Sequence, residues 1–386
     1  MDFMKMFKKG SDPAGDGLLE ECVNPINLES LGLVEGIGPA LTPDFDDVGL
    51  SMREYIEKWK TLYPLTESVD SVLEKLKELK KLVWSLPVCV GDGGDIAQGR
   101  KWYKLWNVDP VNDVKISELY WCNDINLFRY LRSFKFKVQQ AFTMLRRTLA
   151  WRRFKKIDDI NTDNVAISNT GGMVYRKGYD KSGKPVVYYR PSNEVDFDRE
   201  RQVLLLFFML ELAMFTCLFA EGNDKVVLIV DLAKWSISKM PSLELVIDTV
   251  RASSDHYPGV VHDIIIIDPP MLMDPLMQMI KAVVDQQTAK KIVMKHRGSK
   301  LEAFLKNKID VSQVEESMGG ANKTHYDHDL YWPGETKAAI EIHERRNKWI
   351  AAHEKEWLES KKNGAPGAPL GGEDSATAEP SETTAE

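Results

Sequence analysis

The stretch His256-Tyr-Pro-Gly-Val-Val-His-Asp-Ile-Ile-Ile-Ile-Asp-Pro-Pro270 contains four consecutive isoleucines that end at an aspartate and two prolines. Four β-branched residues without alternation predict a strand buried on both faces, which is typical of a parallel sheet covered by helices. Pro269 and Pro270 predict the end of that strand, because proline cannot donate a ladder hydrogen bond. The methionine-rich segment 271–279 that follows is apolar and deformable, so the junction predicts a ligand chamber with a lid.

Outward from this strand, apolar runs alternate with helical periodicity. Such alternation with short connections predicts βαβ units and a mostly parallel sheet. The expected strands are 185–189, 226–232, 261–267 and 291–295. The expected helices are 51–63, 66–86, a helical region over 114–160, 200–220, 243–254, 274–287, 299–307 and 335–361.

The composition of the 386 residues sets broad limits. A net charge of −7 gives no general argument for nucleic-acid binding. The four cysteines are far apart and form no Cys-x-x-Cys pair, which favours reduced thiols in a cytosolic protein. The apolar segment 203–220 is near the lower length limit for a membrane span, but it carries Glu211 at its centre, which favours a buried helix.

Catalytic motifs are missing from the sequence. It contains no Gly-x-Ser-x-Gly elbow, no His-Glu-x-x-His, no Walker lysine and no dinucleotide glycine fingerprint. His325 and His328 have possible metal spacing but lack a third committed ligand. We therefore predict no catalytic residues, no metal and no cofactor other than a bound lipid, and an α/β-hydrolase-like enzyme is disfavoured.

Several fragments together resemble the CRAL-TRIO lipid-binding family, over about residues 115–332. The fragments occur in the family's order and roughly its spacing, which makes coincidence improbable. They are Asp124–Val138 with Leu149–Arg153, Gly178–Val187, Val230–Ala233, Tyr257-Pro258, Ile267–Pro270, Thr288–Ile292 and Met318–Gly320.

The resemblance implies an α/β fold in which a mostly parallel or mixed sheet, flanked by helices, encloses an apolar pocket. An all-helical amino-terminal lobe and an extra carboxy-terminal helix would flank it. The expected organisation is an extended arm at 1–50, extra helices and a loop at 51–114, the helical lobe at 115–164, the lipid-binding domain at 165–332, a helix at 335–361 and a disordered acidic tail at 363–386.

Members of the family that bind phosphatidylinositol hold the headgroup phosphate with a small polar set. The matching residues of this sequence are Lys135, Thr288 and Lys291. The family's arginine position holds Phe134, and its glutamate position holds Gly259. The positions that recognise choline in exchanging members correspond to Arg176, Val187, Val226 and Leu228, so choline recognition is not expected.

The same resemblance implies a gate helix and a pocket floor. The helix after Pro270 would swing at a membrane, and its broad methionine-rich surface agrees with that role, although the same surface also fits an ordinary core helix. The gate residues are Met271, Met273, Leu276, Met277 and Ile280, and the floor residues are Val187, Leu228, Ile265 and Ile267.

The leading hypothesis is a monomeric, cytoplasmic protein that associates peripherally with membranes. It would bind one lipid and transfer or present it. The expected lipid is phosphatidylinositol or a related anionic phospholipid, and another hydrophobic ligand is the open alternative. The alternative is an interaction scaffold without transfer activity, as in members of the superfamily that bind small GTPases. The helices at both ends of the chain would then contact protein partners, and neither hypothesis involves nucleic acid.

Overall fold

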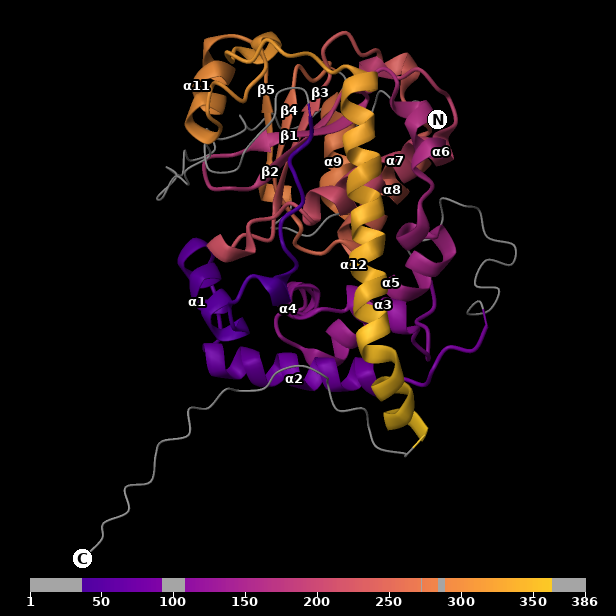
Figure 1. The fold of residues 1–386 in the computed structure, drawn as a ribbon. Coiled ribbons are helices and arrows are strands. Elements are labelled where there is room, and N and C mark those ends of the chain that lie inside the picture. The colour runs from indigo at the N-terminus through magenta and orange to yellow at the C-terminus, as the bar shows by residue number, and fades with distance from the viewer. Residues whose placement is uncertain (1–36, 92–107, 272, 284–288, 363–386) are drawn as a thin grey trace, which may run out of the picture. The chain divides into compact units, whose positions relative to one another are not determined.

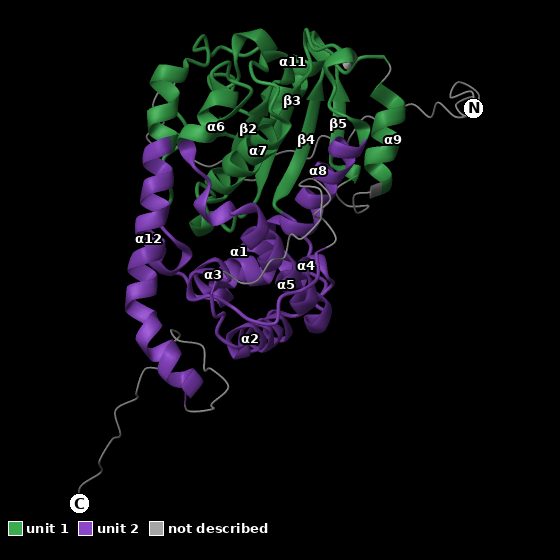
Figure 2. Ribbon diagram, turned by 90° about the vertical axis from the view of Figure 1, so that its right-hand side faces the viewer, with its two compact units in different colours: residues 1–42, 163–243, 260–335 green, residues 43–162, 244–259, 336–386 purple. Residues whose placement is uncertain are grey.

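The computed structural model describes residues 37–91, 108–271, 273–283 and 289–362 (Figure 1). These residues form two compact units (Figure 2). Unit 1 holds the described residues of 1–42, 163–243 and 260–335, and unit 2 holds those of 43–162, 244–259 and 336–386. The expected tail at 363–386 and most of the expected arm at 1–50 lie outside the described residues.

A five-stranded sheet in the order β1-β2-β3-β4-β5 forms the centre of unit 1. β1 pairs antiparallel with β2, and the remaining neighbours pair in parallel. The β1–β2 turn is closed by Asp180, whose carboxylate accepts hydrogen bonds from the backbone N–H groups of Ser182 and Lys184. The strands are Val174–Tyr179 (β1), Pro185–Tyr189 (β2), Val226–Asp231 (β3), Val261–Ile267 (β4) and Ile292–Lys295 (β5).

Helices connect and flank these strands. Asp198 caps the amino end of α7, because its side chain accepts a hydrogen bond from the backbone N–H of Arg201. α7 packs closely against β1 and β2. Because successive parallel strands are neighbours and such crossovers are right-handed, α7 and α9 lie over the same face of the sheet. The helices of unit 1 are Thr162–Asn169 (α6, from Asp163 on), Arg199–Met214 (α7), Met273–Val283 (α9), Ser299–Lys308 (α11) and the start of His328–Lys362 (α12).

Unit 2 is helical. Ser51 and Ser68 cap the first two helices by accepting backbone hydrogen bonds from Glu54 and Ser71. The part of α12 that belongs to unit 2 packs on α2, where the Trp349 ring lies 6.3 Å from that of Trp84. The helices of unit 2 are Met52–Leu62 (α1), Val69–Ser85 (α2), Ile116–Trp121 (α3), Asp124–Ser133 (α4), Val138–Lys155 (α5), all but the first residue of Leu243–His256 (α8), and α12 from Thr336 on.

The structure confirms the α/β class, the mixed sheet and the isoleucine strand, which ends at Ile267 directly before Asp-Pro-Pro. The sequence analysis missed β1, and the buried helix expected at 200–220 ends at Met214. The carboxy-terminal helix begins at His328, seven residues earlier than expected at 335, and it carries Pro333 within its first turns. In the described part of the chain, no helix is long and apolar enough to cross a membrane.

A buried ion pair joins β1 to the start of α12. Arg176 and Glu335 each have 1% of the side chain exposed, and Arg176 Nη2 lies 2.7 Å from Glu335 Oε2. Arg176 Nη1 also donates to the Pro39 carbonyl, 3.1 Å away. Gly38 is required beside this pair, because a Cβ there would lie 2.3 Å from Glu335 Oε1. One guanidinium therefore holds three segments of unit 1 together.

We expect Arg176→Met to lower the free energy of unfolding by about 3–5 kcal/mol, because it leaves the Glu335 carboxylate buried without its counter-charge. The double variant Arg176→Met/Glu335→Leu should recover most of that loss, since apolar side chains of similar volume can replace a buried pair. Urea unfolding of the parent, Arg176→Met, Glu335→Leu and the double variant measures both effects. A double variant as unstable as the sum of the two single variants would contradict this account.

Candidate functional site

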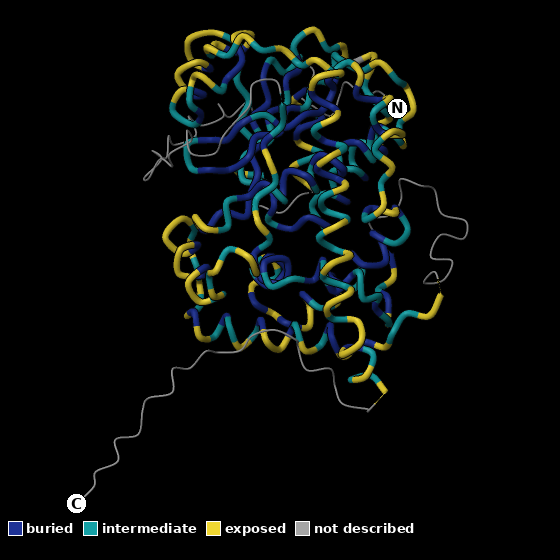
Figure 3. The backbone as a smooth tube through the Cα atoms, viewed as in Figure 1, coloured by how far each residue is buried: buried dark blue, intermediate teal, exposed yellow. Residues whose placement is uncertain are grey.

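The residues of the central strands range from buried to half-buried (Figure 3). Leu228, Val230 and Ile264, on the central strands, share one face and are half-buried. Their neighbours on the other face, Ile229 and Ile265, are completely buried. We call the first the open face and the second the closed face. Central strands that are accessible on one apolar face provide a surface against which an apolar ligand can pack.

The pairing register divides the four expected floor residues between these faces. Val187 pairs with Leu228, so both lie on the open face. Ile265 and Ile267 alternate with Ile264 and Ile266 and lie on the closed face, where both are completely buried. The four residues therefore do not form one surface.

The closed face is covered by the segment 309–326. The ring of Tyr175 on β1 stacks on that of Tyr188 at 5.2 Å and lies 5.3 Å from Tyr326. The Tyr175 hydroxyl donates to the Glu315 carboxylate over 2.6 Å. α7 lies on the opposite side, with Arg176, because Phe208 of α7 lies 5.9 Å from Trp332 at the start of α12.

The expected gate helix is α9, and its residues occupy two environments. Met273, Leu276 and Met277 are buried, and Ile280 is half-buried. Met271, before the helix, has 96% of its surface exposed. Asp268, at the base of this segment, adopts a left-handed φ of 51°, an uncommon conformation outside glycine.

The expected headgroup residues lie in different parts of the structure. Lys291 directly precedes β5 in unit 1, and its Nζ donates to the Val261 carbonyl at the start of β4, 3.2 Å away. Thr288 lies outside the described residues. Lys135 belongs to unit 2, where it is exposed in the α4–α5 turn with a left-handed φ of 51°.

Gly259, at the position where the family has glutamate, lies beside the same turn of unit 2. A Cβ on Gly259 would be 3.5 Å from Ser133 Oγ, which is an ordinary contact. The residue has a φ of +69°, however, a conformation that L side chains rarely adopt. The backbone at this position therefore favours glycine for conformational reasons.

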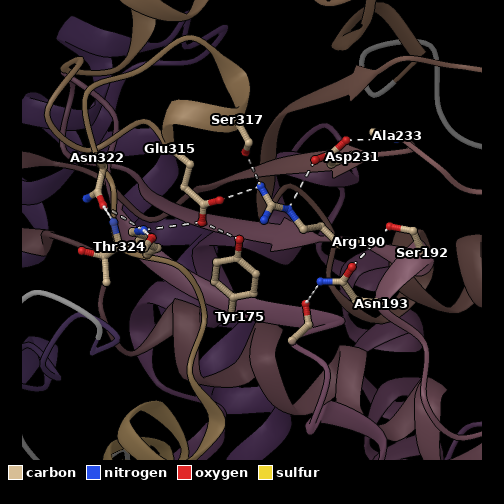
Figure 4. A network of polar contacts seen from close by, with 12 residues as sticks. Tyr175, Arg190, Ser192, Asn193, Asp231, Ala233, Glu315, Ser317, Asn322 and Thr324 are labelled. Atoms are coloured by element: carbon tan, nitrogen blue, oxygen red, sulfur yellow. Dashed lines mark hydrogen bonds and ion pairs between the residues drawn. The ribbon is translucent and has the colours of Figure 1, made fainter.

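A polar cluster that sequence reasoning missed lies on the closed face, at the carboxyl ends of the parallel strands (Figure 4). Arg190, after β2, places Nη2 2.7 Å from Glu315 and Nε 3.3 Å from Asp231 at the end of β3. Arg297, after β5, places Nη2 2.8 Å from the same Asp231 carboxylate and also pairs with Asp268. Acidic and basic side chains thus alternate from Glu315 to Asp268, and we call this set the carboxyl-edge network.

Glu315 is completely buried in this network. Burial alone would raise the pKa of its carboxyl group, but the Arg190 guanidinium, the Tyr175 hydroxyl and the Lys177 ammonium outweigh burial and lower the pKa below its usual range. Lys177 Nζ also donates to the Thr324 carbonyl over 2.7 Å. The network therefore fastens the segment 315–324 to β1 and β2, and it helps to bury the central residues of the closed face.

A sequence signal for this network exists. Arg190, Asp231, Asp268 and Arg297 each directly follow or end a strand of the parallel set, or lie within two residues of its end. Charged residues at these positions come together because the carboxyl ends of parallel strands share one edge of a sheet. Glu315 carries no such signal, since its place depends on how the segment after α11 folds back.

We expect Glu315→Gln to lower the free energy of unfolding by about 3 kcal/mol at pH 7, because Arg190 and Lys177 lose a buried counter-charge. Since the folded pKa of Glu315 is lowered, its stabilisation is complete above the unfolded value of about 4.3 and disappears as the pH falls through the folded value. The stabilities of parent and variant should therefore converge in acid.

Urea unfolding at several pH values between about 7 and 3 measures this convergence. Glu316→Gln, at the exposed neighbouring residue, is the control and should stay within about 0.5 kcal/mol of the parent. A constant difference between Glu315→Gln and the parent at every pH would contradict the charge-based explanation.

Among the described residues, no group of three or more His, Cys, Asp or Glu side chains could hold a metal ion. His328, one of the two histidines with possible metal spacing, stacks its ring on Trp332 at 5.6 Å. Its Nδ1 lies 3.0 Å from the Tyr326 hydroxyl.

Comparison with known proteins finds similarity to one family of proteins. The CRAL/TRIO domain model matches residues 169–320. Phosphatidylinositol transfer protein PDR17 of Saccharomyces cerevisiae is 26% identical over 256 residues, which cover 63% of this chain and 71% of that protein. Patellin-1 of Arabidopsis thaliana is 25% identical over 231 residues, which cover 57% of this chain and 39% of that protein.

A CRAL-TRIO domain-containing protein of Schizosaccharomyces pombe, C23B6.04c, is 26% identical over 227 residues, which cover 59% of this chain but 22% of that protein. The chain thus spans most of PDR17 and a minor part of the other two relatives. The crystal structure of Sfh5 superposes with a TM-score of 0.48 and 15% identity, covering 73% of this chain and 99% of that one.

Proposed function

Because the chain belongs to the CRAL/TRIO family as a divergent member, we propose that it binds a single lipid and transfers or presents it at membranes. The observation that carries the proposal is a difference in burial at the centre of the sheet. Leu228, Val230 and Ile264 on the open face are half-buried, whereas Ile229 and Ile265 on the closed face are completely buried. Val187 and Ile266, also on the open face, are buried. Such binding needs no covalent chemistry. Each buried CH₂ group of an acyl chain contributes about 0.8 kcal/mol, so a chain lying along this face is held firmly.

The proposed chamber lies between the open face and the helices that cross it. Val187, Leu228, Val230 and Ile264 provide an apolar wall without a charged side chain. Arg176 belongs to the same cross-strand row, but its charge is neutralised by Glu335 and buried. The wall therefore suits hydrocarbon, and it offers no free charge to a headgroup.

α9 is the proposed lid of this chamber. Its buried methionines are unbranched and polarisable, so they can repack between a protein contact and a lipid contact at small cost. In this proposal the lid opens at a bilayer, where the lipid chain exchanges one apolar environment for another.

The proposed headgroup is an anionic phospholipid, with phosphatidylinositol as the first candidate, because the relative PDR17 is a phosphatidylinositol transfer protein. Lys291 carries the charge for the phosphate, and Thr288, three residues earlier, adds a hydroxyl. Lys135, which belongs to unit 2, stays a prediction from the resemblance. The Lys291 ammonium uses one of its three donors on the Val261 carbonyl, and this hydrogen bond orients it at the amino ends of β4 and β5.

We expect Leu228→Trp to abolish lipid loading while the protein stays folded, because the larger side chain would occupy the proposed chamber. Ile229→Trp, one residue further on the closed face, is the matched control. It should lower the free energy of unfolding by about 1–3 kcal/mol, because that face has no free volume. Native mass spectrometry for bound lipid, together with urea unfolding, separates the two effects.

If Leu228→Trp destabilises the protein as much as Ile229→Trp does, the open face is packed solid and the chamber does not exist. If the parent itself carries no lipid after purification from cells, the scaffold alternative replaces lipid binding. In that case the helices at both ends of the chain become the surfaces to examine for protein partners.

We expect Lys291→Ala and Thr288→Ala to reduce the transfer of phosphatidylinositol between vesicles roughly tenfold each, since each loses a charge-assisted or hydroxyl contact of about 1.5 kcal/mol. Lys323→Ala removes the same charge from an exposed residue of unit 1 and should leave transfer unchanged. Thermal unfolding of all three should match the parent. Normal transfer of phosphatidylinositol by both site variants would refute the headgroup assignment.

A further inference from the structure

The segment 290–308, which runs from the start of β5 through α11, is strongly basic in an acidic protein. It contains seven lysine or arginine residues and one acidic residue, Glu302, whereas the whole chain has a net charge of −7. A local excess of one sign that opposes the net charge indicates a surface for a partner of the opposite sign.

Not all of these cations are free to meet a partner. Arg297 pairs with Asp231 and Asp268, and Lys308 Nζ lies 2.8 Å from the Asp263 carboxylate. Lys291 is assigned to the lipid headgroup above. The remaining four have no carboxylate partner among the described residues, and we call them the β5–α11 basic strip: Lys290, Lys295, Lys300 and Lys306.

The strip is accessible. Lys290, Lys300 and Lys306 are exposed, and Lys295 is half-buried with its ammonium 5.5 Å from the Phe304 ring. A lysine on the edge strand β5 can also serve to prevent pairing with another sheet. That explanation covers Lys295 but not Lys300 and Lys306, because these two lie on a helix and cannot protect a strand edge.

Unit 1 also carries an exposed apolar side chain. His296, next to Lys295 in the sequence, places Nδ1 3.6 Å from the carboxylate of Asp268, and Met271, three residues after Asp268, is almost fully exposed. His296 itself has 72% of its side chain exposed. Long cationic side chains beside an exposed apolar one match the interface of a bilayer, where the stem or thioether enters the lipid and the charge stays at the headgroups.

We propose that the β5–α11 basic strip docks unit 1 on a bilayer surface that carries anionic headgroups. The proposal rests on the proposed function, since a lipid carrier must meet a membrane, but no lysine of the strip belongs to the chamber wall or to the bound headgroup. The strip contributes long-range attraction that weakens with salt, and Met271 contributes a short-range apolar contact.

The test uses the full chain and vesicles of phosphatidylcholine, with and without about 20 mol% phosphatidylserine. We expect Lys300→Gln/Lys306→Gln to lower the partition coefficient onto the anionic vesicles about 25-fold at low salt, because each lysine near such a surface is worth roughly a fivefold change. Binding to pure phosphatidylcholine should not change. Lys77→Gln/Lys81→Gln, on the exposed side of α2, removes the same charge and should bind as the parent does.

Equal binding by parent and strip variant, or an equal loss in the α2 control, would overturn the docking surface. It would also be overturned if an acidic protein retained the parent but not the strip variant, while anionic vesicles bound neither. Native mass spectrometry on the same samples separates this proposal from the proposed function. A strip variant that is loaded with lipid but does not bind vesicles supports both, whereas an unloaded parent that still binds anionic vesicles refutes only the lipid chamber.

Discussion

The sequential order of β2, β3, β4 and β5 across the sheet is the constraint on which the rest of unit 1 depends. Right-handed crossovers between successive neighbours must run over one face, so α7 and α9 cannot cover the other. The opposite face needs a separate cover, and the chain supplies it from the segment 309–326 after α11. The segment 309–326 therefore covers the closed face, and the crossover helices lie over the open face.

The carboxyl-edge network holds the segment that covers the closed face in place. The segment 315–324 has little regular structure, and its backbone alone would not hold it on the strands. Glu315 supplies the attachment, because one buried carboxylate accepts from Tyr175 and pairs with Arg190 and Lys177. The ionised carboxylate is stable in this buried position because its neighbours Arg190 and Lys177 are cationic. Half-buried apolar side chains of the central strands, those of Leu228, Val230 and Ile264, lie on the open face.

Strands with an unbroken apolar run were predictable, and the strand 261–267 was located to the residue. β1 was not, because its sequence Val-Tyr-Arg-Lys-Gly-Tyr combines two cations and a glycine, and only its long-range partners make it a strand. The same reason explains why the sequence could not divide the floor residues between the two faces of the sheet. Ile265 and Ile267 are as apolar as Val187 and Leu228, and only the pairing register shows that they point to the opposite face.

By itself, the sequence determined the class of the fold, the position of the central strands, the end of β4 at Asp-Pro-Pro and the excess of positive charge after α9, because these depend on residue type and local spacing. The tertiary structure alone decided which apolar side chains remain accessible, which cations are neutralised and where Glu315 is buried. These outcomes depend on contacts between residues that are far apart in the chain, such as Arg176 with Glu335 and Tyr175 with Glu315, and no local pattern records them.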